Sequence, residues 1–305
     1  MKKYLLISVI LLGIFYSCAF EEEDVVYPYT SVYLPNQSYN RNIVVGEGLE
    51  LEIGVIFSGV VDNRQDRSVS YTIDPSLINT AGQYELPQTF YSFGDSEIRI
   101  PKGQLKGYLP VKLDSLTFLN DPKSLTGEYI IPIRLVSSST IDSINAGMNY
   151  MKLSVSYFAK QHGNYTYSGK ITATNAGGST EATYANISTV TESYRLLKTT
   201  GPTRMRVVAD ATSQSKDPAK ATYSFIVDVP VYGGGEITIL PDPTSPVVVS
   251  PDGKSTYDVS TKTFRLNYQY AKDGSTYKVS EELVFRNRIR DVQSNGLYIN
   301  EWRGF

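Results

Sequence analysis

The chain has 305 residues, a formal net charge of -2 and 20% charged side chains. This length allows one large domain or, more naturally, two domains of ordinary size, each with a real hydrophobic core. The near-neutral charge gives no electrostatic reason to bind nucleic acid. One Cys and one His exclude a cysteine–histidine zinc site, an iron–sulfur cluster and a disulfide framework, so we expect no metal and no cofactor.

Tyrosine is the aromatic residue in excess, with 24 Tyr against 11 Phe and one Trp. An aromatic ring with a polar tip suits the half-buried surface of a pleated strand. The composition therefore predicts an all-β fold.

Residues 1–17 are predicted to be a lipoprotein signal peptide. Two lysines precede an apolar run from Tyr4 to Tyr16, which is too short to span a bilayer permanently as a helix. The run ends at Ser17, directly before Cys18, and this arrangement resembles the site at which bacterial lipoproteins are cleaved and acylated. Acylation at Cys18 would hold the mature chain on a membrane. The alternative is an ordinary secretory signal with a free cysteine.

Residues 18–26 are expected to form a lipidated, acidic tether. Four successive acids, from Glu21 to Asp24, repel anionic headgroups and cannot pack, so this segment should be extended and solvated. The run also resembles the signal that sends Bacteroidetes lipoproteins to the outer face of the outer membrane. The alternative is a linker that only adds solubility.

The first folded region is predicted over 27–158. Runs with a period of two indicate short strands with one apolar face, and the clearest of them begin at Leu49, Val69, Leu109, Tyr129 and Met151. Clusters of turn residues separate these runs and no crossover helices lie between them, which favours an antiparallel, immunoglobulin-like β-sandwich. One run contains Pro132, which has no amide hydrogen, so its strand should lie at an edge or carry a bulge.

Three segments of this region carry a family resemblance: 100–104 (IPKGQ), 108–113 (YLPVKL) and 129–135 (YIIPIRL). Together they resemble the N-terminal domain of unknown function that is common in Bacteroidetes surface lipoproteins. Such proteins are encoded in polysaccharide-utilisation loci and are similar to surface glycan-binding proteins or to N-terminal modules of glycosidases. The resemblance implies a role at the outer membrane beside the transport and degradation components of the same locus.

Residues 159–162 are expected to be a linker, and 163–305 a second β domain. Its clearest unit is a hairpin in which alternating runs flank Asp273-Gly274, a strong signal for a tight turn. Its strands suggest either an up-and-down meander closing into a barrel or a second sandwich. The region resembles the C-terminal domain of unknown function that often follows the first family, some members of which look like calycin barrels.

We predict no catalytic residues, and therefore no enzyme. His162, at the domain junction, is expected to be a solvated linker residue because no nucleophile and orienting acid accompany it. Glu281 and Glu282 point to opposite faces of one strand, so they cannot flank a glycosidic bond together. Glycosidase relatives carry an additional large barrel for which this chain has no room.

The candidate ligand-binding residues are aromatic, because sugars pack their C–H patches on aromatic rings and hydrogen-bond their hydroxyls to polar neighbours. Trp302, flanked by Glu301 and Arg303, is the first choice, although a terminal Trp also commonly plugs a β domain. Tyr268, Tyr270 and Tyr277 are further candidates; their alternation also fits core positions.

These observations predict a lipid-anchored protein, facing the cell exterior, that binds a glycan without chemistry. Two alternatives remain open at this point. One is an adhesin-like or structural surface protein that binds a protein partner, which an exposed apolar patch would favour. The other is a calycin-like carrier of a small apolar ligand, which requires an enclosed apolar cavity.

Overall fold

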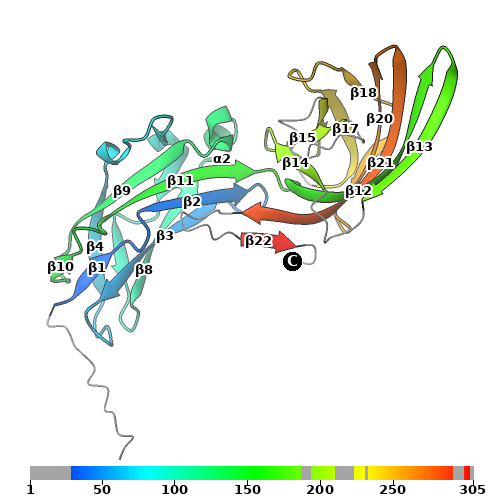
Figure 1. The fold of residues 1–305 in the computed structure, drawn as a ribbon. Coiled ribbons are helices and arrows are strands. Elements are labelled where there is room, and N and C mark those ends of the chain that lie inside the picture. Colours follow the sequence, from blue (N-terminus) through cyan, green and yellow to red (C-terminus); the bar gives the residue numbers. More distant parts are fainter. Residues whose placement is uncertain (1–28, 187–193, 210–222, 231–232, 291–298, 303–305) are drawn as a thin grey trace, which may run out of the picture.

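The computed structural model describes residues 29–186, 194–209, 223–230 and 233–290, and the backbone of 299–302 (Figure 1). The predicted signal peptide and tether, with Cys18, lie outside the described residues. No helix in the described part of the chain is long and apolar enough to cross a membrane. The described chain consists of strands built around two separate hydrophobic cores, which confirms the predicted all-β class.

The first core is enclosed by strands that pair in the order β10-β1-β3-β8-β7-β4-β9-β11-β2, with β5 beside β9 and β6 beside β8. The strands are β1 (Ser31–Tyr33), β2 (Ser38–Val44), β3 (Glu50–Ser58), β4 (Arg67–Ile73), β5 (Tyr84–Glu85), β6 (Tyr91–Phe93), β7 (Glu97–Ile100), β8 (Lys106–Leu113), β9 (Tyr129–Ser137), β10 (Ser143–Ile144) and β11 (Tyr150–Phe158). The short helix α2 (Ser115–Phe118) and the 3-10 turns Pro75–Leu77, Gln88–Phe90 and Pro122–Leu125 connect them.

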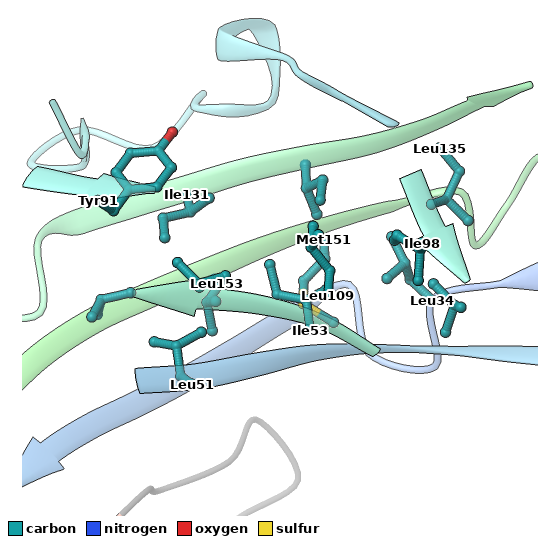
Figure 2. Close-up of a cluster of buried hydrophobic side chains, with 14 of the residues drawn as sticks. Leu34, Leu51, Ile53, Tyr91, Ile98, Leu109, Ile131, Leu135, Met151 and Leu153 are labelled. Atoms are coloured by element: carbon teal, nitrogen blue, oxygen red, sulfur yellow. The ribbon is translucent and has the colours of Figure 1, made fainter. Parts of the chain in front are cut away.

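The ladder of this region folds over at β7, which joins β8 through one residue pair and β4 through four. The apolar side chains of the two resulting layers meet between them, as Figure 2 shows for Leu51, Ile53 and Leu109 against Ile131 and Leu153. Each fully buried side chain of this kind contributes about 1.5–3 kcal/mol. The predicted period-two runs are therefore the inner faces of a sandwich.

The prediction that the strand of Pro132 lies at an edge or carries a bulge is half right. Its ladder with β4 has a register shift, because the neighbours Ser70 and Tyr71 stand opposite Ser137 and Leu135, but the strand is not at an edge. β9 lies inside the sheet, between β4 and β11, and Pro132 stands opposite Lys152 of β11. On the other side, its carbonyl accepts a hydrogen bond of 2.8 Å from the amide of Asp74, just beyond the end of β4 at Ile73. A residue's amide and carbonyl point to the same side of a strand, so the donor that proline lacks faces the place where β4 has already ended.

The second core lies among strands that continue directly from β11. They are β12 (Gly163–Asn175), β13 (Gly178–Asn186), β14 (Arg195–Thr199), β15 (Arg204–Val208), β16 (Ser224–Asp228), β17 (Gly235–Pro241), β18 (Val249–Pro251), β19 (Ser255–Asp258), β20 (Thr263–Lys272), β21 (Ser275–Arg290) and β22 (Ile299–Trp302). The hairpin between β20 and β21 turns at Asp273 (φ 49°) and Gly274 (φ 73°), which confirms the predicted Asp-Gly turn.

These strands close into a barrel at one end only. Among the described residues, β12, β14, β15, β16, β17, β19, β20 and β21 pair in a ring, and the ring closes because β12 pairs with both β14 and β21. The β12–β14 pairing covers only 163–165; farther along, β12 pairs with β13 instead. The rest of the domain is therefore a half-barrel whose long hairpins extend past the closed ring (Figure 1).

His162 lies at the junction of the two cores, and the prediction that it is a solvated linker residue is wrong. Its ring stacks on Phe158 with 4.0 Å between centroids, and its Nδ1 accepts a hydrogen bond of 3.1 Å from the backbone amide of Thr199. Burial, with Arg288 and Lys198 nearby, lowers its pKa to about 3. His162 is therefore a neutral packing residue.

A second contact at the junction comes from the far end of β21. Arg288 and Arg290 each place a guanidinium nitrogen 3.3 Å from the carboxylate of Glu47, in the turn after β2. Arg288 also donates to the backbone carbonyl of Lys160, and Arg290 to that of Asn42. One carboxylate of the first domain thus binds two arginines of the second.

Candidate ligand-binding site

The structure places the predicted site residues in two separate places. Trp302 pairs through its backbone with Asn287 of β21, and its side chain lies outside the described residues. Tyr268, Tyr270 and Tyr277 share the inner face of the β20–β21 hairpin. Tyr268 is fully buried and Tyr270 is 5% exposed, whereas Tyr277 is half-buried. Their role in ligand binding stays a prediction.

Two of these tyrosines belong to a row of stacked rings. Tyr270 and Tyr277, directly opposite each other in the ladder, stack with 5.0 Å between centroids and 14° between planes. Tyr223 continues the row, 6.4 Å from Tyr270, and Lys272 places its Nζ 4.6 Å above the Tyr223 ring. Sequence reasoning missed Tyr223 because its neighbours in the row are about fifty residues away along the chain.

A buried carboxyl group lies on the same inner face of β21. Glu281 is 4% exposed, and its two oxygens lie 2.9 Å from the hydroxyl of Tyr184 and 3.0 Å from that of Tyr268. Burial raises the pKa of this carboxyl. Glu282, on the other face, instead receives a hydrogen bond from exposed Arg265. The predicted opposition of the two glutamates is confirmed, and they form no catalytic pair.

The first domain carries an open groove of about 460 Å³ on its outer surface. It is lined by residues of β2, β3 and β8: Tyr39, Arg41, Glu50, Leu51, Glu52, Tyr108 and Pro110. Apart from Leu51, these side chains lie at least partly in solvent. The groove therefore combines aromatic rings with two carboxylates and a guanidinium group.

Tyr108 is the most prominent ring of this groove, with 51% of its surface exposed. It stands opposite Gly54 in the β3–β8 ladder, beside the pair formed by Glu52 and Pro110. A β-carbon at Gly54 would lie 3.5 Å from Cε1 of the ring, so Tyr108 lies across the glycine. A flat, open ring beside carboxylates has the chemistry that binds a sugar: C–H groups on the ring face and hydroxyls on the oxygens.

Sequence reasoning missed this groove, although part of the signal was present. Tyr108 is out of phase with Leu109 and Val111, which predicts that it points outward, as do Glu50 and Glu52 relative to Leu51. The sequence does not show that Tyr39 and Arg41 lie next to this face.

Among the described residues, no group of three or more His, Cys, Asp or Glu side chains could hold a metal ion.

The comparisons with known proteins agree with the prediction of an N-terminal and a C-terminal domain. One family model, for an N-terminal domain, matches residues 27–142. A companion model, for the C-terminal domain of like-named proteins, matches residues 153–284. The chain belongs to this two-domain family. The match confirms the predicted order of an N-terminal and a C-terminal domain in one chain.

Solved structures similar to this family member come from Bacteroides. A Bacteroides ovatus protein of unknown function aligns with a TM-score of 0.71 at 21% identity, over 90% of this chain and 98% of its own. An auxiliary nutrient binding protein from Bacteroides thetaiotaomicron aligns with a TM-score of 0.48 at 13% identity, over 85% of this chain and 93% of its own. The first alignment shows a shared fold. No curated protein matches the chain.

Proposed function

We propose that this protein binds glycans, without cleaving them, as a lipid-anchored component of a bacterial polysaccharide-utilisation system. The observation that supports this most directly is the groove of the first domain, where Tyr108 is half exposed beside Glu50, Glu52 and Arg41. A sugar ring on Tyr108 buries its C–H face, while its hydroxyls donate to the glutamates and accept from the guanidinium group.

The open shape of the groove favours binding along a chain over enclosure of a small molecule. Its lining comes mainly from exposed side chains of the paired strands β3 and β8, with Tyr39 and Arg41 of β2 beside them, and strands hold side chains at fixed spacing. Such a surface is suited to a polymer that extends past both ends of the site. The affinity then comes from stacking and hydroxyl hydrogen bonds, which require no catalytic group.

The proposed location of the protein in the cell rests on its N-terminal sequence. Acylated Cys18 would anchor the chain in the outer membrane, and the acidic segment after it would direct the protein to the cell exterior. There the glycan would pass to the transport and degradation components of the same locus. Metabolic labelling with a clickable palmitate tests the anchor: we expect label on the wild type and none on Cys18→Ala. A Cys18→Ala protein that stays in the membrane fraction contradicts it.

The binding role is tested with the full chain, purified in detergent, on a glycan array and then by titration calorimetry with the glycans that bind. We expect Tyr108→Ala to weaken binding by about tenfold, the loss of one stacked ring. The matched control is Tyr84→Ala, because Tyr84 is 45% exposed and belongs to β5, away from the groove. It should bind as the wild type does.

Two results would overturn the proposal. If no glycan on the array is bound by the wild type, the protein is not a glycan-binding protein. If glycans are bound but Tyr108→Ala binds as tightly as Tyr84→Ala, the groove is not the site. Release of shortened oligosaccharides by the purified wild type would contradict the non-catalytic part of the proposal.

A further inference from the structure

Arg195, the first residue of β14, is buried with part of its hydrogen-bonding capacity unused. The residue is only 2% exposed, and within the part of the chain that the structure describes neither Nε nor Nη2 of its guanidinium group has a hydrogen-bond partner. Buried polar atoms are almost always paired, and guanidinium groups remain charged at any physiological pH. An unpaired edge on a buried cation therefore requires an explanation.

The position of Arg195 is where the closed ring of the second domain gives way to the half-barrel. Arg195 pairs with Tyr165 at the last position of the β12–β14 ladder, and its guanidinium carbon lies 4.7 Å from the centre of the Tyr167 ring. Tyr167 covers one face of the group, while the edge formed by Nε and Nη2 stays unpaired. Tyr184 lies next to Tyr167, with 6.3 Å between ring centroids, and both rings are half-buried.

Glu281 is the buried acid on this inner face; the charge of Arg195 opposes the effect of burial on its pKa, but the two groups are not in direct contact. No ion pair joins it to Arg195 in the described part of the chain, and its oxygens face Tyr184 and Tyr268. The Tyr268 hydroxyl lies 3.0 Å both from the carbonyl of Ala209 and from Oε1 of Glu281. The Tyr268 hydroxyl is therefore shared between the Ala209 carbonyl and the Glu281 carboxyl group, and Tyr184 donates to the other carboxyl oxygen.

The cluster therefore holds a buried guanidinium group whose Nε–Nη2 edge contacts no acid among the described residues. An uncompensated buried charge is unfavourable, and an anion that neutralises it is bound strongly. The Nε–Nη2 edge of a guanidinium group presents two parallel N–H groups, which match the two oxygens of one carboxylate. The half-buried Tyr167 and Tyr184 rings beside it offer the apolar surface that a sugar ring contacts.

We infer that Arg195 anchors the carboxylate of a uronic acid, so that the second domain holds its own binding site for an acidic glycan. The carboxylate site is argued from Arg195 and its surroundings, whereas the assignment of a sugar rests on the proposed function. This site is separate from the groove around Tyr108, which needs no charged sugar. The protein would then recognise neutral and acidic parts of one polymer with different domains.

The test compares matched ligands on the full chain in detergent by titration calorimetry. The probes are trisaccharides of galacturonate, glucuronate and mannuronate, their methyl esters, which keep the ring but lose the charge, and a sulfated galactose trisaccharide. We expect the wild type to bind one acid at least about tenfold more tightly than its ester, because charge-assisted pairs are worth more than neutral ones. Arg195→Met should remove this preference.

A second measurement separates ligand binding from a structural role. Without ligand, Arg195→Met should melt at the same or a higher temperature than the wild type, because it removes a buried charge without an ionic partner. A lower melting temperature would mean that Arg195 has a structural partner and would overturn the inference. If Arg195→Met does not fold, Arg195→Lys keeps the charge but not the bidentate edge, and it should lose the preference for the acid.

The remaining outcomes are distinguishable. If neutral glycans bind through the Tyr108 groove but no acid is preferred over its ester, the inference fails and the proposed function stands. If the sulfated sugar binds as tightly as the uronates and depends on Arg195, the assignment of a carboxylate is wrong. If no sugar of either kind binds, both the inference and the proposed function fail.

Discussion

The hydroxyl of Tyr184 donates a 2.9 Å hydrogen bond to Oε2 of Glu281 across the strand that separates them. Tyr184 belongs to β13, Glu281 to β21, and both stand opposite Gly169 of β12. The contact is possible because Gly169 has no side chain: a β-carbon there would lie 2.6 Å from the tyrosine oxygen and 2.7 Å from the β-carbon of Glu281. The glycine is therefore required by this contact.

Gly169→Ala should destabilise the second domain by about 1–3 kcal/mol, because the added methyl group must displace Tyr184 or separate β12 from β21. Urea unfolding monitored by tyrosine fluorescence measures the effect. Gly201→Ala is the control, since a β-carbon at Gly201 would approach nothing closer than 3.6 Å, on the flexible side chain of Arg204. Equal stability of the two variants would contradict the role given to Gly169.

Glu281→Gln tests whether the buried carboxyl is neutral. Burial raises the folded-state pKa of Glu281 above its unfolded value, so above about pH 4.3 the folded state keeps a proton that the unfolded state loses. The contribution of this proton to the free energy of unfolding is largest below the unfolded-state pKa. It decreases as the pH rises and is lost at the folded-state pKa of Glu281. The stability of Glu281→Gln relative to the wild type should therefore increase from pH 4 to pH 8.

Unfolding curves at several pH values check this, and Glu282→Gln, on the exposed face of the same strand, is the control and should show no such trend. A Glu281→Gln variant that loses stability relative to the wild type as the pH rises would mean that the carboxyl is ionised in the folded protein. Glu281 would then be the counter-ion of Arg195.

The longest alternating strands, such as β3, β8 and β11, could be predicted because each one shows its buried face in its own sequence. The alternation around Leu51, Leu109 and Leu153 is local, and all three lie in the first core. The contacts that build the sites are not local. Tyr184 and Glu281 are 97 residues apart, and nothing in either strand records that Gly169 lies between them.

Pairing of side chains from distant strands also limited the prediction of the groove. The outward phase of Tyr108 could be read from its neighbours, but the approach of Tyr39 depends on where the parallel β2–β11 ladder places β2. His162 was misjudged for the same reason: its hydrogen-bond partner Thr199 belongs to β14, 37 residues later. A lone histidine near a boundary shows nothing locally that predicts its burial.

Glu47→Gln should weaken the attachment between the two domains. The Glu47 carboxylate lies 3.3 Å from a guanidinium nitrogen of both Arg288 and Arg290. The Arg288 side chain is only 7% exposed. A neutral glutamine amide in place of Glu47 would therefore leave the buried charge of Arg288 less well compensated. We expect a loss of about 1 kcal/mol, limited by the 43% exposure of Glu47. Calorimetric unfolding should show two transitions that lie farther apart than in the wild type.

The control for this junction is Glu236→Gln, which removes an ion pair with Lys254 whose side chains are 66% and 67% exposed. Such exposed pairs contribute little, so its unfolding should match that of the wild type. High salt should bring the wild type closer to Glu47→Gln, because screening weakens the same contact. Unfolding of Glu47→Gln that is indistinguishable from the control would contradict the role of this contact.

His162 should make the junction sensitive to acid. Its folded-state pKa is lowered to about 3, whereas the unfolded chain binds the proton near pH 6.5, so the unfolded state gains protons first and stability falls as the pH drops below about 6.5. The loss should reach up to about 2 kcal/mol at pH 5. His162→Gln, whose amide oxygen can still accept from the Thr199 amide, removes the titration, so its stability should change less between pH 7.5 and pH 5. Unfolding curves of both proteins at these two pH values measure the difference, and parallel pH profiles would show that His162 titrates normally in the folded protein.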